Sequence, residues 1–287
     1  MEINNHLSSC RVDNFNRFNS PFFNQFDFKE HTLKLSVNIN KTYCFPTFYT
    51  DICFAAIAFK CSYKKAKELM PHAGLKPVKL PGGNALIVFS CYEYKTVHEM
   101  NPYNEVGFLI PVLASATLNV PLLPLIAGQL FKKFGYHALC MPVTSLESKI
   151  RGDEIWGLPK QLNAINYSAD ETYFTCSIHE TNGDEVVRLK IPKAGKSIHL
   201  DETTFLYTIK EGKLLKSQTW FKGESMVNTF PKQLFKSTIP ENEFIKIGDS
   251  KTGKMLRFLE IGKHPFQTRY TNNLMSAFDL PLKDYRN

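Results

Sequence analysis

Two pairs of apolar segments, each pair separated by a short polar turn, constrain the fold of this chain most. They are residues 173–178 with 186–191, around Asn182-Gly183, and residues 205–209 with 213–219, around Glu211-Gly212. Glycine in such a dipeptide reaches the positive φ values that a tight hairpin turn requires. The 23 phenylalanines and 12 tyrosines add to the preference for strands. We therefore predict a mainly antiparallel β fold.

The first half of the chain carries the patterns of strands and of one short helix. Apolar and polar residues alternate over residues 33–39, as in a half-buried strand. Further strands are expected over residues 52–59 and 85–94. Ser62 can cap a short helix that ends at Met70, before a proline. Residues 1–30 show no period, so we expect an N-terminal arm followed by a single domain over residues 31–287.

Residues 106–131 contain no charged side chain and are long enough to cross a bilayer, which takes about 20 apolar residues. Pro111, Pro121 and Pro124 argue against one uninterrupted helix. We expect a buried strand through Val112, a loop and a short apolar helix over residues 122–134. The sequence therefore predicts no stable membrane span, but an element of the core, of a subunit interface or of a pocket lid.

The distribution of charge and of metal-binding residues excludes several classes of partner. The net charge is +8, yet the lysines are scattered and form no run of five, so we expect no nucleic-acid partner. The seven cysteines form no C-x-x-C pair, which is typical of free thiols in a reducing cytoplasm. The eight histidines show no metal-binding spacing. We expect a cytoplasmic protein that uses no metal or cofactor.

Lys160 lies among apolar residues in the segment Ile155-Trp156-Gly157-Leu158-Pro159-Lys160-Gln161-Leu162. A lysine amine is ordinarily protonated at neutral pH. Burial disfavours the charged form, and the neutral amine can attack a carbonyl carbon to form an imine. The alternative is a lysine whose stem is buried while its amine stays in water. Spacing alone leaves both interpretations open.

Three segments, in this order, resemble the acetoacetate decarboxylase family: Asn104-Glu105-x-Gly107-x-x-Ile110-Pro111-Val112, Gly152-x-Glu154-Ile155-Trp156-Gly157-x-Pro159-Lys160, and Ser276-Ala277-x-Asp279-Leu280-Pro281-Leu282-Lys283. The resemblance implies an α+β fold that is mainly antiparallel β, with a closed barrel or cone of strands and a few flanking helices. It also implies that Lys160 is the imine-forming nucleophile. Glu105 would be a carboxylate that faces Lys160 and orients substrate or handles protons.

The same resemblance suggests other residues of the site. Ser90, Trp156 and Gln161 are expected to contact substrate. By ungapped counting Ser90 stands where the family has a second pocket glutamate, and Gln161 stands where many members have a second lysine. Burial alone would then have to favour the neutral amine of Lys160. Glu154 is expected to have a structural role, bound to backbone amides or to an arginine.

The resemblance also raises the question of which cation meets the carboxylate of a substrate. The family has an arginine for this role in its N-terminal half, and no arginine occurs here between Arg17 and Arg151. The nearest cations in sequence are Lys41 and Lys60. A lysine is a point charge and does not reproduce the bidentate contact of a guanidinium group. The apolar residues 106–131 suggest a keto acid larger or more apolar than acetoacetate.

Taken together, the resemblance implies a carboxy-lyase that decarboxylates a β-keto acid through an imine on Lys160, without a cofactor. Two alternatives stay open. One is an aldolase or dehydratase that uses the same imine, and the other is a non-catalytic barrel that binds an apolar ligand. We expect a small keto acid as the partner and a homo-oligomer as the assembly.

Overall fold

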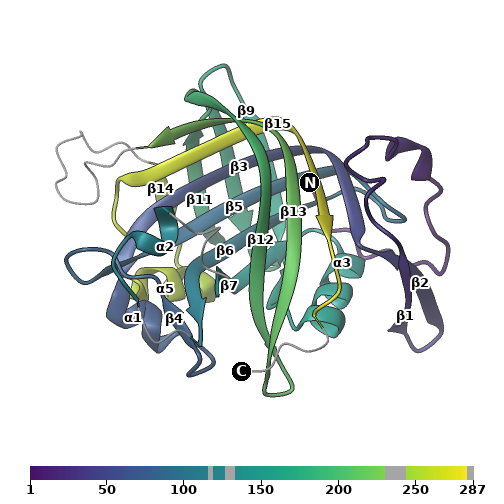
Figure 1. Cartoon of the computed structure of the whole chain (residues 1–287), viewed down its shortest axis with the longest axis horizontal. Helices are drawn as coiled ribbons and strands as arrows, with labels where there is room; N and C mark the ends of the chain where they lie inside the picture. Colours follow the sequence, from purple (N-terminus) through teal and green to yellow (C-terminus); the bar gives the residue numbers. More distant parts are fainter. Residues whose placement is uncertain (116–118, 127–132, 230–243, 283–287) are drawn as a thin grey trace.

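A closed ring of strands forms the centre of the molecule (Figure 1). The computed structural model describes residues 1–115, 119–126, 133–229 and 244–282, and within them seven strands form this ring. Their order is β6 (Tyr103–Ala114), β5 (Asn84–Val97), β3 (Thr47–Ser62), β15 (Pro265–Phe278), β13 (Lys213–Thr229), β12 (Lys196–Lys210) and β7 (Phe134–Val143), and β6 pairs with β7 to close it. Neighbours are antiparallel except β12 and β7. The predicted barrel is confirmed.

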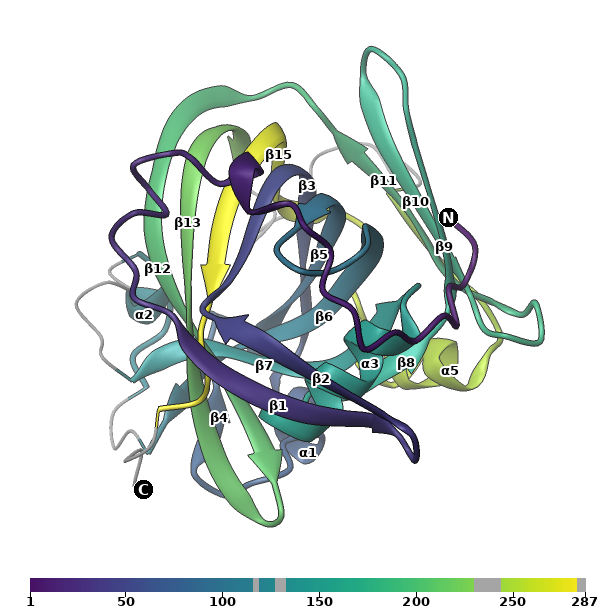
Figure 2. The ribbon, with the colours of Figure 1, turned by 90° about the vertical axis from the view of Figure 1, so that its right-hand side faces the viewer.

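A second sheet stands beside the barrel (Figure 2). It contains β14 (Ile245–Ile247), β11 (Glu185–Pro192), β10 (Tyr173–His179) and β9 (Ala164–Ala169). Apolar side chains of both sheets, such as Phe89 and Phe108 of the barrel and Phe174 of β10, form one buried core between them. Two short strands, β4 (Leu75–Pro77) and β8 (Lys160–Leu162), pair with β6 and β7 respectively.

The barrel strands have two different faces, because successive side chains of a strand point to opposite sides. Phe89 and Phe108 face the second sheet, whereas Tyr92, Tyr94 and Tyr103 belong to a separate cluster on the interior face. Glu105 follows Tyr103 by two residues in β6 and so shares that interior face.

One end of the barrel is covered by helix α3 (Leu146–Arg151), its π-helical continuation η3 (Gly152–Trp156) and the hairpin of β1 (Lys29–Ser36) and β2 (Ile39–Phe45) (Figure 1). Ser145 caps α3, since its hydroxyl accepts a hydrogen bond from the backbone N–H of Ser148. Gly157 ends η3 with a φ of 63°, in the left-handed region that glycine adopts without strain. The remaining described helices are η1 (Phe15–Arg17), α1 (Tyr63–Glu68), α2 (Leu123–Ile126) and α5 (Lys251–Phe258).

Several predicted elements are confirmed. Both predicted hairpins form, as the pairs β10 with β11 and β12 with β13. The strands expected over residues 52–59 and 85–94 lie within the longer β3 and β5. The hydroxyl of Ser62 accepts a hydrogen bond from the backbone N–H of Lys65 and so caps α1.

The single strand predicted over residues 33–39 is wrong. The chain turns at residues 37–38, and β1 and β2 pair on either side of that turn. Val37 lies in the turn and is 84 % exposed. Apolar alternation continued through the turn without a glycine or proline, so the pattern could not show that the chain reverses there.

The apolar helix predicted over residues 122–134 is only partly observed. Helix α2 covers Leu123–Ile126, residues 127–132 lie outside the described part of the chain, and Phe134 already begins β7. Leu122 and Leu125 pack against Leu80 and Leu86, in a cluster separate from the barrel interior. Across the described residues, no helix is both long enough and apolar enough to span a bilayer.

The N-terminal residues lie against the folded chain without regular strands. The amino group of Met1 donates a hydrogen bond to the carbonyl of Ile165. Further along, Phe18 and Phe23 are buried against Phe48 of β3. The boundary between an arm and a domain at residue 30 stays a prediction.

Candidate active site

Lys160 is the first residue of β8, and the preceding turn carries it into the interior. Strand β8 runs parallel to β7, with Lys160 opposite Met141. The carbonyl of Pro159 accepts a hydrogen bond from the backbone N–H of Met141 and so fixes the start of the strand. The side chain of Lys160 is buried, with 7 % of its surface exposed. It is not a lysine whose amine lies in water.

The amine of Lys160 contacts two polar groups from different elements. Its Nζ lies 2.6 Å from Oε2 of Glu105, a buried carboxylate of β6. It also donates a hydrogen bond of 2.8 Å to the hydroxyl of Ser148 in α3. The ring of Tyr103 lies 5.8 Å from the same nitrogen. The structure thus brings together the two residues for which the sequence predicted catalytic roles.

The stem of Lys160 lies against the backbone of Gly152, where η3 begins. A Cβ atom at position 152 would stand 2.4 Å from Cδ and 2.6 Å from Cε of Lys160. Atoms at such separations overlap, so the position accommodates only glycine while the lysine stays in place. Gly152 therefore sets the path of the lysine from the backbone to Glu105.

Three buried tyrosines, Tyr49, Tyr94 and Tyr103, and the half-buried Tyr92 lie around this pair on the interior face. Tyr94 contacts the rings of Tyr49, Tyr92 and Tyr103, with centroids 4.5, 5.3 and 4.9 Å away. Burial, with the nearby Glu105 carboxylate as a further cause, raises the pKa of Tyr92, Tyr94 and Tyr103. These phenols stay protonated at neutral pH and can donate hydrogen bonds. No sequence motif indicated these tyrosines, although Tyr103 is two residues before Glu105 and therefore on the same face of β6.

Ser90 lies on the interior face, but no contact between its side chain and the amine of Lys160 is observed among the described residues. It is two residues before Tyr92 in β5, and Tyr92 is directly opposite Glu105 in the pairing of β5 with β6. The side chain of Ser90 is buried, and its hydroxyl interacts with that of Tyr92. A contact between Ser90 and substrate stays a prediction.

Trp156 and Gln161 lie in different surroundings from Lys160. The indole of Trp156 is buried, stacks on Phe278 at 4.7 Å and donates a hydrogen bond to the carbonyl of Asp279. Gln161 is exposed, because the next residue of a strand points to the opposite side. It lines a cavity of about 290 Å³ between β8 and α5, together with Glu180, Lys251 and Thr252. The structure therefore separates Gln161 from the amine.

Glu154 also lies outside the interior. Its side chain is 60 % exposed and its Oε2 is 3.9 Å from the amine of Lys210. Within the residues that the structure describes, it is bound to neither backbone amides nor an arginine, so the contacts expected for its structural role are not observed. The cause is the π-helical turn η3, which places residue 154 on the outer side.

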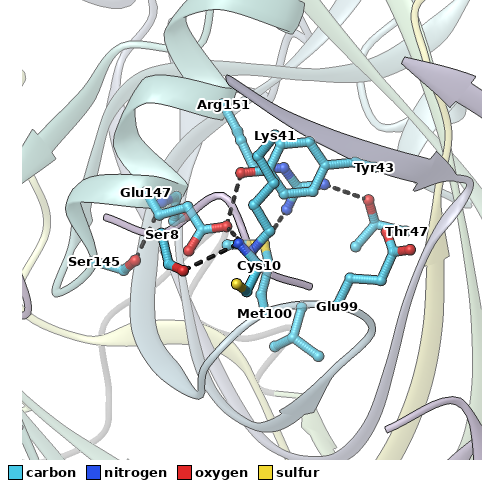
Figure 3. Close-up of polar contacts among 12 residues, drawn as sticks. Ser8, Cys10, Lys41, Tyr43, Thr47, Glu99, Met100, Ser145, Glu147 and Arg151 are labelled. Carbon is cyan, nitrogen blue, oxygen red and sulfur yellow. Dashed lines mark hydrogen bonds and ion pairs between the residues drawn. The ribbon is translucent and has the colours of Figure 1, made fainter. Parts of the chain in front are cut away.

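A second buried polar cluster lies beside Ser148, on α3 and the β1–β2 hairpin (Figure 3). Lys41 forms an ion pair of 2.9 Å with Glu147, whose Oε1 also accepts a hydrogen bond from Tyr43. Lys41, which the sequence offered as a partner for a substrate carboxylate, is thus already paired. Arg151, at the end of α3, is buried in the same cluster.

No group of three His, Cys, Asp or Glu side chains in the described residues is arranged to hold a metal ion. Around the amine of Lys160 the structure places a carboxylate and several hydroxyl groups. Such a set can form an imine and transfer protons around it.

Comparison with known proteins identifies the family. The family model described as acetoacetate decarboxylase (ADC) matches residues 37–209, which include both Glu105 and Lys160. The chain belongs to the acetoacetate decarboxylase family. The resemblance seen in three short segments is thereby confirmed at the level of the family. Lys283, in the third segment, lies outside the described residues.

Solved structures of acetoacetate decarboxylases share this fold. The enzyme from Legionella pneumophila superposes with a TM-score of 0.58 at 13 % identity, over 84 % of this chain and 88 % of that one. An acetoacetate decarboxylase-like enzyme from Sphingomonas wittichii gives a TM-score of 0.52 at 13 % identity, over 93 % and 98 %. No curated protein sequence matches the chain. At this identity the solved structures support the fold, and the reaction has to be argued from the site.

Proposed function

We propose that the chain is a Schiff-base-forming enzyme that decarboxylates a β-keto acid through Lys160, without a cofactor. The observation that carries the proposal is the 2.6 Å contact between Nζ of Lys160 and Oε2 of Glu105 in the barrel interior. A carboxylate at this distance can take the proton of the ammonium group and leave a neutral amine next to a carboxylic acid. That amine is the nucleophile that imine formation requires.

In the proposed reaction Glu105 first takes this proton from the ammonium group and later returns it. The amine attacks the keto carbon, and the carbinolamine loses water when Glu105 returns the proton to its hydroxyl group. In the protonated imine the bond to the carboxylate carbon breaks, carbon dioxide leaves, and the electron pair passes through the enamine to the nitrogen. Protonation of the enamine carbon and addition of water then release the ketone and the amine of Lys160.

The interior tyrosines favour a second candidate. Tyr103, whose ring lies 5.8 Å from the amine, and its neighbour Tyr94 are phenols that stay protonated, because burial raises the pKa of both. Such donors can stabilise an aldehyde oxygen or a leaving hydroxyl group. An imine-dependent aldolase or dehydratase would use them while keeping the substrate carboxylate. Of the described residues in the apolar stretch 106–131, Leu122 and Leu125 pack against Leu80 and Leu86, in a cluster separate from the barrel interior, so these two residues do not support a larger substrate.

Borohydride trapping tests the proposal. The protein is incubated with acetoacetate, acetopyruvate and longer keto acids, adducts are reduced and located by peptide mass spectrometry, and carbon dioxide is measured in parallel. An adduct at Lys160 with carbon dioxide supports the decarboxylase, and an adduct without it supports the second candidate. If no carbonyl compound modifies Lys160, the enzymatic proposal is wrong and a non-catalytic binding barrel is the better account.

Lys216 provides a matched control, because it is another buried lysine, in β13, and burial lowers the pKa of its amine. Its amine lies 3.7 Å from the centre of the ring of Phe205, in β12. Lys160→Arg keeps a positive charge beside Glu105 but has no nucleophilic amine, so it should abolish trapping. Lys216→Arg should leave trapping intact. Adducts that persist in the first variant and vanish in the second would contradict the assignment.

A further inference from the structure

Arg151 is a buried guanidinium group without a carboxylate partner in the described residues. Its residue surface is 3 % exposed, and no Asp or Glu oxygen of those residues lies within 4.0 Å of it. The two buried lysines nearby differ from it in this respect, because Lys41 is paired with Glu147 and Lys160 with Glu105. Since arginine stays protonated in proteins, Arg151 brings one uncompensated positive charge to this region.

The partners that Arg151 does have leave part of its bonding capacity unused. Its Nη2 donates a hydrogen bond of 2.8 Å to the hydroxyl of Thr47, its Nη1 contacts the sulfur of Met100, and its Nε has no acceptor among the described residues (Figure 3). A thioether sulfur is a weak acceptor. The guanidinium also lies 4.3 Å from the ring of Tyr43, which offsets the charge only in part. A buried charge of this kind is strongly stabilised by an anion.

Arg151 is also close in the chain to two residues that contact Lys160. Ser148, which accepts the hydrogen bond from Lys160, is three residues earlier in α3, so both side chains lie on one face of the helix. Gly152, which follows Arg151, touches the stem of Lys160. In the barrel, Thr47, which accepts a hydrogen bond from Arg151, lies on the same face of β3 as Tyr49. The charges of Arg151 and Glu105 have opposite effects on the pKa of Tyr49, because both groups lie near its hydroxyl.

We propose that Arg151 binds the carboxylate of the substrate whose carbonyl carbon is attacked by Lys160. The inference rests on the proposed function and makes it more specific: the substrate is a keto acid whose carboxylate lies a few bonds from its carbonyl. Bound in this way, the carboxylate supplies the missing negative charge and accepts two hydrogen bonds from the fork of the guanidinium. Arg151 is thus a residue that determines specificity for acids over neutral ketones.

The test compares an anionic carbonyl compound with a neutral one. Borohydride trapping at Lys160 is measured against the concentration of acetoacetate and of 2,4-pentanedione, a diketone without a carboxylate. For Arg151→Met, the half-saturating concentration of acetoacetate should rise about 10- to 100-fold, while that of the diketone should change less than about twofold. Arg151→Lys should lie between, since it keeps the charge and loses the fork. Arg17→Met, at an exposed arginine paired with Asp51, is the control and should change neither.

Three outcomes separate this inference from the proposed function. If the parent protein forms no adduct with either compound, the proposed function fails before Arg151 is tested. If both compounds lose affinity equally in Arg151→Met, while circular dichroism shows a folded protein, Arg151 is structural and the inference is overturned. If Arg151→Met does not fold, the parent protein is tested with two inhibitors of diketone trapping. Butyrate, which has a carboxylate, should slow trapping at Lys160, whereas the neutral butyramide should not. Equal effects of the two compounds overturn the inference.

A kinetic split distinguishes the two reactions. If the carboxylate leaves as carbon dioxide, its contact with Arg151 weakens in the transition state, so Arg151→Lys should raise KM and leave kcat within about threefold. If the carboxylate is retained, as in an aldol or dehydration reaction, the contact persists and a misplaced substrate should lower kcat as well. If Arg151→Lys leaves KM unchanged, whichever of the two reactions the enzyme catalyses, carboxylate binding by Arg151 is contradicted.

Discussion

The hydroxyl oxygen of Ser148 accepts a hydrogen bond from Nζ of Lys160 at 2.8 Å, and it does so from the helix that closes the barrel end. With Glu105 on the opposite side, the amine is held between a strand of the barrel and a helix outside it. Ser148 also interacts with the hydroxyl of Tyr103. The position of the amine therefore depends on how α3 is docked.

Ser148→Ala should slow imine trapping at Lys160 about tenfold, since a hydrogen bond to a charged group contributes about 1.5 kcal/mol. The reason is a less well-oriented amine, so the loss should occur with neutral and anionic carbonyl compounds alike. The initial rate of adduct formation, followed by mass spectrometry, measures it.

The matched control is Ser145→Ala, which removes the cap of α3 but no contact with Lys160. It should lower the free energy of unfolding by about 1 kcal/mol and leave the trapping rate unchanged. If the parent protein and Ser148→Ala are trapped at equal rates, Glu105 alone positions the amine.

Gly152→Ala should displace Lys160, because the added Cβ would lie 2.4 Å from Cδ of the lysine. The side chain is buried and held at its tip, so it cannot move away without losing Glu105 or Ser148. A shift of about 1 Å at a reacting group can reduce the rate about 100-fold, which is the loss expected for trapping. Gly262→Ala is the control, since its new Cβ would meet no atom closer than 3.5 Å. Similar trapping rates in the two variants would refute this role of Gly152.

The sequence was sufficient to predict that Glu105 faces Lys160, and to predict much of the β architecture. Hairpins with a glycine in the turn were found, because the turn residue and the flanking apolar runs give independent signals. Lys160 and Glu105 were found by resemblance, and their contact joins β8 to β6 across a sequence separation of 55 residues that no periodicity could link.

The rest of the site could not be predicted for physical reasons. Ser148 and Arg151 reach the interior from α3, a helix of six residues whose short apolar pattern gives no helical signal. Gln161 was expected to contact substrate, but strand alternation sends it to the side opposite Lys160, where it is exposed. The exposure of Glu154 could not be predicted from the sequence, because a π-helical turn departs from the periods that sequence patterns assume.

The ion pair between Lys41 and Glu147 should be important for stability, because both side chains are almost fully buried. Glu147→Gln leaves the ammonium of Lys41 without an anion and should lower the free energy of unfolding by about 3–5 kcal/mol. The double variant with Lys41→Met should recover part of this loss, since neither charge is then left unpaired. Glu260→Gln, which breaks the partly exposed pair with Lys65, should cost less than about 1 kcal/mol. Urea denaturation measures all three, and equal losses in the two single variants would contradict the expectation.

His137 should make stability depend on pH. It is buried in β7, and its Nδ1 lies 2.9 Å from the carbonyl of Tyr207, to which the neutral ring donates a hydrogen bond. Burial lowers the pKa of His137 below its ordinary value of 6.5, and the hydrogen bond to Tyr207 opposes this only in part. Below pH 6.5 the unfolded chain therefore binds more protons than the folded chain, so stability is full above that pH and falls as the pH decreases.

His137→Asn should reduce this dependence by up to about 1.4 kcal/mol per pH unit, which is the contribution of one proton. Urea denaturation at about pH 7.5 and about pH 5.5 measures it, on either side of the ordinary histidine pKa. Part of the slope should remain, because burial also lowers the pKa of His98. His31→Gln, at an exposed histidine of β1, is the control and should leave the slope as in the parent. If His137→Asn retains the full slope, the protons taken up on unfolding belong to other groups.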